Sequence, residues 1–290
     1  MRQILILGGT RFFGRHLAQK LVARGDEVTL LSRGRVDDGL GDRVRRITAD
    51  RTQPDELRAA LGTRDWDLVF DQIAFTAAEA RALGEILRGR TERLIFTSSQ
   101  SVYGMGAGLA EEAFDPLRAT YATAVSAQDD YAEAKRQTEI EYMKCAALRP
   151  VLARMPLVIG VDDYTQRLRW HVERVREGKP IFLPNPQARL GFIRSDFAGE
   201  VLAQLADSAL VGPVNTACPG DIALEELLGW IGEAVGRPVV FADAPTDENH
   251  SPYGVPETWT MSLAKLESVG VRAPELRHWL PELITTLARA

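Results

Sequence analysis

The first fourteen residues constrain this chain more than any other segment. An apolar run, residues 3–7, leads directly into Gly8-Gly9-Thr10-Arg11-Phe12-Phe13-Gly14. This order predicts a buried strand, a tight glycine turn and the start of a helix. Such a turn places backbone N–H groups and a helix N-terminus against a phosphate. Many folds use glycines in strand-to-helix turns for the backbone conformation alone, so the segment indicates a dinucleotide site only together with a second motif.

The second motif lies near the middle of the chain. Residues 93–97 are predicted to form a buried strand that leads to Ser99, and Tyr131 and Lys135 lie four positions apart on a predicted helix. Positions four apart share a helix face, so both side chains can point into one site. An ammonium beside a phenol lowers the pKa of the phenol and suits it to proton transfer. A solvent-exposed pair at the same spacing is the structural alternative.

Together these motifs resemble the short-chain dehydrogenase/reductase superfamily, in its extended and atypical branch of NAD-dependent epimerase/dehydratase-like proteins. The similarity covers essentially the whole chain. Gly8, Arg11 and Gly14 occupy the three positions of the family's Gly-x-x-Gly-x-x-Gly turn, with Arg11 in place of the middle glycine. Residues 154–160 are similar to the family's Arg-Pro-x-x-x-x-Gly strand, and residues 192–196 to its Phe-Ile-x-Val-x-Asp segment.

The resemblance implies that Ser99, Tyr131 and Lys135 are catalytic. Tyr131 would move the hydroxyl or carbonyl proton. Lys135 would lower the pKa of Tyr131 and hydrogen-bond the nicotinamide ribose, while Ser99 would orient the substrate oxygen during hydride transfer. Related dehydratases carry an acid pair after the serine, where this chain has Gln100 and Ser101. Reductase or epimerase chemistry is therefore expected rather than dehydration.

The cofactor is expected to be NADP(H) in preference to NAD(H). NAD-preferring members place an acid at the end of the second strand to bind the ribose 2′-hydroxyl, whereas this chain has Ser32 there, followed by Arg33 and Arg35. A guanidinium fits a 2′-phosphate with two parallel hydrogen bonds. Asp37 and Asp38 follow in a glycine-bounded loop and are predicted to be solvated.

Further residues are assigned to the cofactor by their place in the same pattern. Asp50, after the third strand, resembles the acid that reads the adenine amino group, with a turn role as its alternative. Arg11 either clamps a cofactor phosphate or blocks the usual approach. The predicted cofactor-binding residues are Gly8, Thr10, Arg11, Phe12, Phe13, Gly14, Ser32, Arg33, Arg35, Asp50, Arg51, Ile73, Ala74, Thr97, Ser98, Tyr131, Lys135 and Met155.

The substrate site is less tightly defined. Nucleotide-sugar binders in the family carry an arginine where this chain has Leu190, with Arg189 displaced by one position. A buried diphosphate without a cationic partner is strongly disfavoured, so a standard nucleotide sugar is not expected. Arg167 and Arg194 are alternative cations that could supply the missing charge. The residues predicted to bind the substrate are Gln100, Tyr103 and Arg189.

The remaining pattern predicts an α/β fold, a Rossmann-type doubly wound parallel sheet with a smaller C-terminal substrate lobe. Strand-like runs alternate with helical patterns, which indicates a parallel sheet covered on both faces. The dinucleotide-binding domain is expected in residues 1–160, and residues 161–290 are mainly assigned to the substrate lobe, interleaved with the last strands. The expected strands are residues 3–7, 27–31, 44–48, 67–71, 93–97 and 151–154, and the expected helices are residues 12–24, 54–61, 77–88 and 128–148.

Composition limits the other function classes. With 45% hydrophobic residues, 26% charged residues and a net charge of −5, the chain has no general attraction for nucleic acid or anionic lipid. Two cysteines and four scattered histidines predict neither a disulfide framework nor a metal site, so the reducing cytosol is the expected compartment. No apolar run is long enough for a membrane span. The expected partner is a small-molecule substrate, and a homodimer is left open.

Two non-catalytic functions stay open beside the enzyme. The Gly-Gly-Thr-Arg-Phe-x-Gly opening is also similar to atypical superfamily members linked to RNA binding, and other members sense the redox state of the cofactor as regulators. The acidic charge balance disfavours RNA, because RNA binding depends on a basic surface. The Ser99, Tyr131 and Lys135 set disfavours a pure sensor, since a binding module has no need of a proton-transferring phenol.

Overall fold

A seven-stranded sheet forms the larger body of the protein. The computed structural model describes residues 1–145 and 147–290. The strand order is β11-β7-β5-β4-β1-β2-β3, and all these pairings are parallel. The predicted doubly wound α/β fold is thereby confirmed. The strands of this sheet are β1 (Gln3–Leu7), β2 (Glu27–Ser32), β3 (Arg45–Thr48), β4 (Leu68–Asp71), β5 (Leu94–Ser99), β7 (Val151–Met155) and β11 (Gly212–Asn215).

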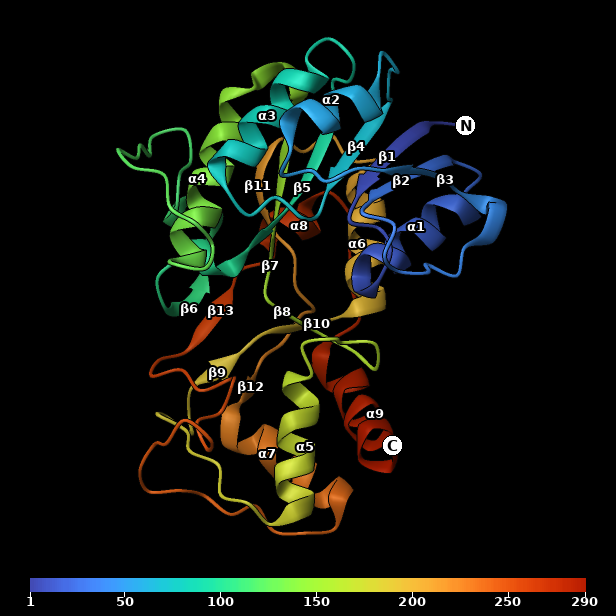
Figure 1. The fold of residues 1–290 in the computed structure, drawn as a ribbon. Coiled ribbons are helices and arrows are strands. Elements are labelled where there is room, and N and C mark those ends of the chain that lie inside the picture. The colour runs from blue at the N-terminus through green and yellow to red at the C-terminus, as the bar shows by residue number, and fades with distance from the viewer.

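Helices cover both faces of the sheet, because its strands are apolar on both sides. Side chains alternate between the faces of a strand, so Ile4 and Ile6 of β1 enter one apolar cluster and Leu5 and Leu7 enter the other. The first cluster lies under α1 and α6, and the second under α2, α3 and α4 (Figure 1). The helices are α1 (Phe12–Ala23), α2 (Pro54–Leu61), α3 (Ala77–Leu87), α4 (Tyr131–Lys144), α5 (Arg167–Glu177), α6 (Ser195–Leu205), α7 (Leu224–Val235), α8 (Ala264–Ser268) and α9 (Leu276–Arg289).

Helix α4 is shorter than the predicted residues 128–148. It begins at Tyr131 because the Asp130 carboxylate accepts the Glu133 backbone N–H at 2.9 Å and so caps the first turn. It ends at Lys144, where the chain turns out of helical geometry. Tyr131 is therefore the first residue of the helix, at the edge of the sheet where the strands end.

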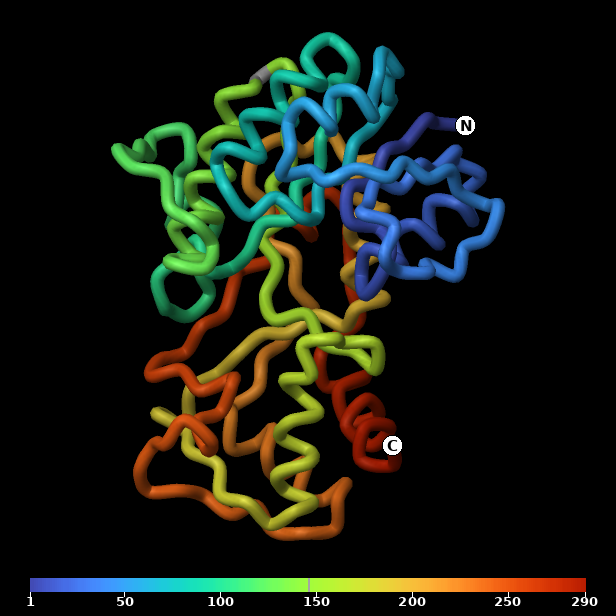
Figure 2. Tube along the Cα trace, viewed as in Figure 1, coloured from blue at the N-terminus to red at the C-terminus, as the bar shows by residue number. Residues whose placement is uncertain are grey.

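The smaller lobe is built from segments that leave the sheet and return to it. After β7 the chain passes through β8 and α5 into the lobe, comes back as β10, α6 and β11, and then leaves again (Figure 2). Strands β8 and β10 pair in parallel between the two bodies. The short strands outside the large sheet are β6 (Gly106–Leu109), β8 (Leu157–Ile159), β9 (Arg189–Leu190), β10 (Phe192–Arg194), β12 (Ile222–Ala223) and β13 (Trp259–Met261).

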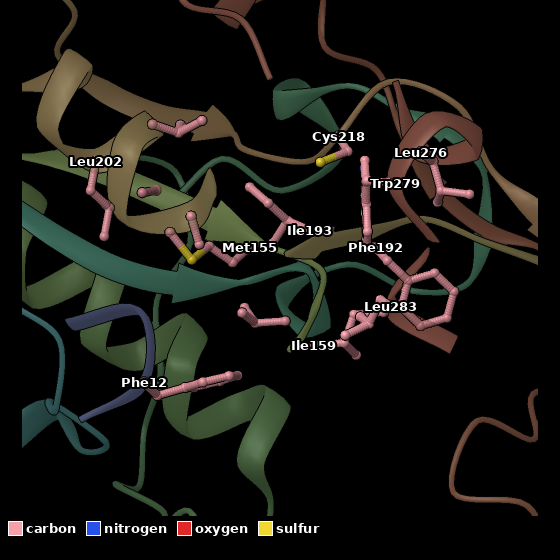
Figure 3. Packing of buried hydrophobic residues seen from close by; sticks show 14 of the residues in the cluster. Phe12, Met155, Ile159, Phe192, Ile193, Leu202, Cys218, Leu276, Trp279 and Leu283 are labelled. Carbon is pink, nitrogen blue, oxygen red and sulfur yellow. The ribbon is translucent and has the colours of Figure 1, made fainter. Parts of the chain in front are cut away.

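One apolar cluster joins the sheet to the smaller lobe. It contains Met155 at the end of β7, Phe192 of β10, and Leu276, Trp279 and Leu283 of α9, all buried (Figure 3). Because one core includes both bodies, the lobe is packed against the sheet rather than attached by a linker. No described helix is both long and apolar enough to cross a membrane.

Buried His171 of α5 makes stability depend on pH. Its Nδ1 donates to the Arg167 carbonyl and its Nε2 accepts from the Ser251 hydroxyl, both at 2.7 Å, and its ring stacks on Tyr253. Burial, assisted by the charge of Arg174, lowers the pKa of His171 to about 4. The full stability is present above the unfolded-state pKa near 6.5. It decreases as the pH falls toward 4, because only the unfolded chain then binds the proton.

We expect this residue to lower the free energy of unfolding by about 2 kcal/mol between pH 7 and pH 5. Urea unfolding of the wild type and of His171→Gln at both pH values measures the effect. Glutamine keeps polar contacts without titrating, so the difference between the two proteins isolates the histidine from the carboxylates. An identical pH dependence in both proteins would contradict the assignment.

Candidate active site

A cleft of about 1010 Å³ opens where the central strands end, between the sheet and the smaller lobe. This edge is where open parallel sheets bind ligands. Ser99 and Gln100 line the cleft, as do nearly all the predicted cofactor residues. Those that line it are Gly8, Thr10, Arg11, Phe12, Phe13, Gly14, Ser32, Arg33, Arg35, Asp50, Arg51, Ile73, Thr97, Ser98, Tyr131, Lys135 and Met155.

The turn after β1 depends on its glycines. Gly8 has φ +93°, a conformation that side chains disfavour. A Cβ on Gly14 would lie 2.4 Å from Gln72 Oε1 and 2.5 Å from the Gly8 carbonyl oxygen, so only glycine lets α1 start this close to the strand. The backbone N–H groups at the start of α1 consequently border the cleft, in the arrangement that binds phosphate.

Positive charge collects at the end of β2. Arg33 and Arg35 are exposed and line the cleft. Asp50 faces them from the end of β3, where its carboxylate accepts the backbone N–H and the hydroxyl of Thr52 at 2.9 and 2.8 Å. These hydrogen bonds, and then the charges of Arg33 and Arg35, lower the pKa of Asp50. Asp50 thus has the turn role considered from the sequence and also borders the space beside the two arginines.

Two charged residues differ from the sequence-based picture. Asp38 was predicted to be solvated, but it is buried and paired with Arg46 at 2.7 Å, which lowers the pKa of its carboxyl. Arg51 lines the cleft, but its guanidinium pairs with buried Asp71 at 2.6 Å and donates to the Glu79 carbonyl at 3.1 Å. Because Asp71 balances its charge, Arg51 is a weaker anion site than the exposed arginines.

Several buried polar atoms on the cleft wall lack a partner among the described residues. They are Arg51 Nε, Gln72 Nε2, Thr97 Oγ1, Gln100 Oε1, Ser101 Oγ and Trp259 Nε1. Leaving such a group unsatisfied costs about 1 to 3 kcal/mol, so these atoms fit a polar ligand in the cleft. Together with the exposed Arg33 and Arg35, they suit a dinucleotide that carries several phosphates.

The residues predicted to be catalytic meet in the middle of the cleft. Ser99 ends β5, and its hydroxyl accepts the Ser101 backbone N–H at 3.1 Å. Tyr131 begins α4 and is 43% exposed. Desolvation of the phenol raises the pKa of Tyr131, and the hydrogen bond with Ser99 acts in the opposite direction. The phenol is therefore protonated at neutral pH.

Lys135 lies behind Tyr131 and is almost completely buried. Its ammonium donates to the carbonyls of Ala74 and Thr97 at 2.9 and 3.0 Å, and burial lowers its pKa to about 8. Lys135 was expected to lower the pKa of Tyr131, but it does not contribute to the shift of that pKa. Its ammonium is directed at these carbonyls instead. An ammonium has three donors, so one remains for a ligand.

A buried ion pair fixes α4 against the sheet. Arg154 of β7 donates to both carboxylate oxygens of Glu139 at 3.0 and 2.6 Å, and both side chains are fully buried. Ser98 donates to the same carboxylate at 2.5 Å. These contacts connect the helix that carries Tyr131 to the strand that carries Ser99, so they set the relative position of the two hydroxyls.

Two of the predicted substrate residues lie outside the cleft. The Tyr103 hydroxyl donates to Asn215 and accepts from Arg154, both at 2.7 Å, in the interior. Burial raises the pKa of Tyr103 to about 12. Arg189 pairs with Asp221 at 2.6 Å beside a shallow hollow on α7. Ala74, predicted to bind the cofactor, reaches the site only through its carbonyl on Lys135.

Comparison with known proteins shows the family of the chain. The model of the NAD dependent epimerase/dehydratase family matches residues 4–193, which is more than half of the chain. The chain belongs to the NAD-dependent epimerase/dehydratase family. Membership confirms the resemblance inferred from the sequence and supports an enzyme of the short-chain dehydrogenase/reductase type that uses a nicotinamide dinucleotide.

The proteins similar to this chain differ in the activities that their names give. The chain is 28% identical over 200 residues to the chloroplast stem-loop binding protein of 41 kDa b of Arabidopsis thaliana, covering 63% of this chain but only 49% of that protein. It is 25% identical over 268 residues to 2′-dehydrokanamycin reductase of Streptomyces kanamyceticus, covering 89% and 70% of the two chains. The NAD complex of Thermus thermophilus UDP-glucose 4-epimerase superposes with a TM-score of 0.76 over 99% of both chains at 22% identity, which shows a shared fold.

Some cleft residues were missed from the sequence. Gln72 lines the cleft and was not predicted, and Arg167, which also lines it, had been considered only as a substitute cation. Gln72 directly follows β4, so its place after a strand was a usable signal. Arg167 starts α5, a helix that the sequence pattern did not predict. Within the described part of the chain, no group of three or more His, Cys, Asp or Glu side chains could hold a metal ion.

Proposed function

We propose that this family member transfers hydride between NADP(H) and a hydroxyl or carbonyl substrate, as a reductase or an epimerase. The observation that carries the proposal is the convergence of Tyr131, Ser99 and Lys135 in a cleft whose opposite end displays Arg33 and Arg35. The smaller lobe, which is built mainly from residues 161–290, is proposed to supply most of the substrate contacts. A screen of carbonyl compounds and nucleotide sugars with NADPH and NADP⁺ tests the reaction class.

Each catalytic side chain has one task in this proposal. A bound nicotinamide would supply or accept the hydride. Tyr131 holds a proton at its phenol oxygen, and its raised pKa suits donation to a carbonyl oxygen during reduction. Ser99 orients that substrate oxygen. Lys135 keeps two carbonyl contacts and offers its remaining N–H toward the cofactor ribose.

We predict that Arg33→Ala weakens NADPH binding roughly ten- to a hundredfold and leaves NADH binding nearly unchanged. The loss of a charge-assisted hydrogen bond to the 2′-phosphate is worth about 1.5 to 3 kcal/mol, which gives this range. Fluorescence titration with both cofactors measures it. Arg118→Ala, at an exposed arginine outside the cleft lining, is the control. Equal weakening of NADH and NADPH would refute the preference for NADP(H).

RNA binding is the second candidate function, favoured by the name of the Arabidopsis relative, a stem-loop binding protein. The net charge of −5 argues against it, because RNA affinity depends on neutralised phosphates. A gel-shift titration with a stem-loop RNA at physiological salt separates the two functions. Retention of RNA by the Tyr131→Phe and wild-type proteins alike, without turnover of any carbonyl, would favour the RNA function.

A homodimer stays a prediction, which light scattering can check.

A further inference from the structure

The charged residues that line the cleft are mostly basic, although the protein as a whole is acidic. Among the described lining residues, six side chains are basic and two are acidic, Asp50 and Glu79. Asp50 lies at the cofactor end beside Arg33 and Arg35. The Glu79 carboxylate caps α3 and accepts the backbone N–H groups of residues 75 and 76 at 2.7 and 3.2 Å. No acidic residue therefore lines the cleft on the side of α5, as far as the structure describes it. The basic lining residues are Arg11, Arg33, Arg35, Arg51, Lys135 and Arg167.

Arg167 is the cation that the proposed cofactor does not explain. It comes from α5 in the smaller lobe, whereas Arg11, Arg33 and Arg35 come from the turns after β1 and β2. Its positive charge lowers the pKa of Tyr131 from across the cleft. Arg167 and Tyr131 thus line the same cleft, with the arginine on the smaller lobe and the phenol at the edge of the sheet.

The protein holds this arginine in position. Its Nε donates to the Thr165 hydroxyl at 3.0 Å, and that hydroxyl donates to Asp163 at 2.6 Å. The Arg167 carbonyl accepts from buried His171 at 2.7 Å. Gln166, which lies between Thr165 and Arg167 in the chain, has φ +59°, a left-handed conformation that is uncommon for this residue type. These contacts orient the side chain before any ligand arrives, which reduces the entropy lost on binding.

The ends of the guanidinium remain available. Its two terminal nitrogens have no hydrogen-bond partner among the described residues, since only Nε is engaged. A guanidinium with both terminal nitrogens free fits a carboxylate or phosphate with two parallel hydrogen bonds. The Trp259 indole N–H also lines the cleft without a partner among the described residues. Both groups are hydrogen-bond donors, as an anion requires.

The other arginines considered for this role are already paired. Arg189 contacts Asp221 outside the cleft, and Arg194 contacts Asp196 with two hydrogen bonds of 2.6 and 2.8 Å. Arg11 lies over the Tyr164 ring at 5.5 Å, beside the glycine turn. Arg167 is therefore the cation best placed to meet a substrate at Tyr131.

We propose that the substrate carries an anionic group, a carboxylate or a phosphate ester, close to the carbon that reacts, and that Arg167 binds this group. That the bound molecule is a substrate rests on the proposed hydride-transfer function. Anion binding at Arg167 does not depend on that function. The proposed substrate is thus an anion, and neither a polycation nor a neutral sugar. Arg167 is then a specificity-determining residue, with Thr165 and Asp163 as its positioning residues.

Binding of small anions tests the site without turnover. Calorimetry measures benzoate, benzamide and inorganic phosphate against the full-length protein, with and without saturating NADP⁺. Benzoate and benzamide have the same shape and differ in charge, and phosphate distinguishes the second anion source. We expect benzoate or phosphate to bind at least tenfold more tightly than benzamide, with the cofactor present as well as absent. The tighter of the two anions indicates which group the substrate carries.

Two arginine variants on α5 assign the effect. Arg167→Gln is expected to weaken the preferred anion at least tenfold and to leave NADPH binding unchanged, while Arg169→Gln, a neighbour outside the cleft lining, changes neither. No preference for either anion over benzamide would overturn the proposal, as would an Arg167→Gln protein that keeps the preference. Equal loss of NADPH and anion would make Arg167 a cofactor ligand instead.

Failure of the proposed function gives a different pattern. If the cleft catalyses no hydride transfer, Tyr131→Phe has no measurable effect on any reaction, but the preference for benzoate or phosphate and its loss in Arg167→Gln persist. If only the anion site is wrong, carbonyl reduction depends on Tyr131 while Arg167→Gln leaves the ratio of anionic to neutral substrates unchanged.

Discussion

Tyr131→Phe is expected to lower turnover by about two to four decades while keeping the fold and cofactor binding. This is the usual contribution of a positioned proton donor or acceptor. Phenylalanine keeps the ring at the first position of α4, so the substitution removes the hydroxyl and its contact with Ser99 alone. Steady-state kinetics on a carbonyl substrate with NADPH, beside a cofactor titration, measures both quantities.

Two further variants make this result specific. Tyr164→Phe removes a hydroxyl from a tyrosine in the same cleft and is expected to leave turnover nearly unchanged. Lys135→Met is expected to impair cofactor binding and turnover together, because the lysine would contact the cofactor ribose and also supports the strand ends through Ala74 and Thr97. Full turnover in Tyr131→Phe would rule out the proposed proton transfer.

The second large effect concerns stability. Glu139→Gln is expected to lower the free energy of unfolding by about 3 to 5 kcal/mol, because it leaves the guanidinium of Arg154 buried without its counter-charge. Glutamine has nearly the same shape as glutamate, so the loss reports charge rather than packing. Urea unfolding monitored by circular dichroism at neutral pH measures the change.

An exposed ion pair provides the comparison for Glu139. Glu226 pairs with Arg277 at 2.6 Å, and both side chains are partly exposed to solvent. Glu226→Gln is expected to cost at most about 1 kcal/mol, since water screens the pair. If both variants lost the same free energy of unfolding, the buried Arg154–Glu139 pair would contribute no more to stability than an exposed ion pair, which would contradict this prediction.

Local patterns were enough to predict the part of the site that one strand and its turn create. The apolar residues 3–7 and the glycines after them predicted β1, its turn and the start of α1, because each signal acts within a few residues. The same holds for Tyr131 and Lys135, whose spacing on one helix is set by helix geometry. Parallel-sheet topology then brings these segments to a common edge.

Side-chain partners from distant segments could not be predicted in this way. Arg51 pairs with Asp71, which is twenty positions further along the chain, and Arg154 is held by Glu139 on another element. Tyr103 was assigned to the substrate from its place after β5, but Arg154 and Asn215 bind its hydroxyl in the interior. Such pairings depend on which strands become neighbours, and a local pattern contains no signal for that.

Electrostatics at Tyr131 shows the same limit. The spacing to Lys135 predicted a lowered pKa, yet the ammonium turns to two backbone carbonyls and desolvation raises the pKa of Tyr131. The sign of such a shift depends on where the charge points and on how much water the cleft admits. Arg167, from a helix that the pattern did not predict, has the favourable effect instead.

A crystal structure of the complex with NADP⁺ tests the central claim most directly. The account predicts a dinucleotide in the cleft, with its pyrophosphate at the glycine turn, its 2′-phosphate at Arg33 or Arg35 and its nicotinamide ring beside Tyr131. A cofactor bound elsewhere, or one whose nicotinamide lies away from Tyr131, would contradict it.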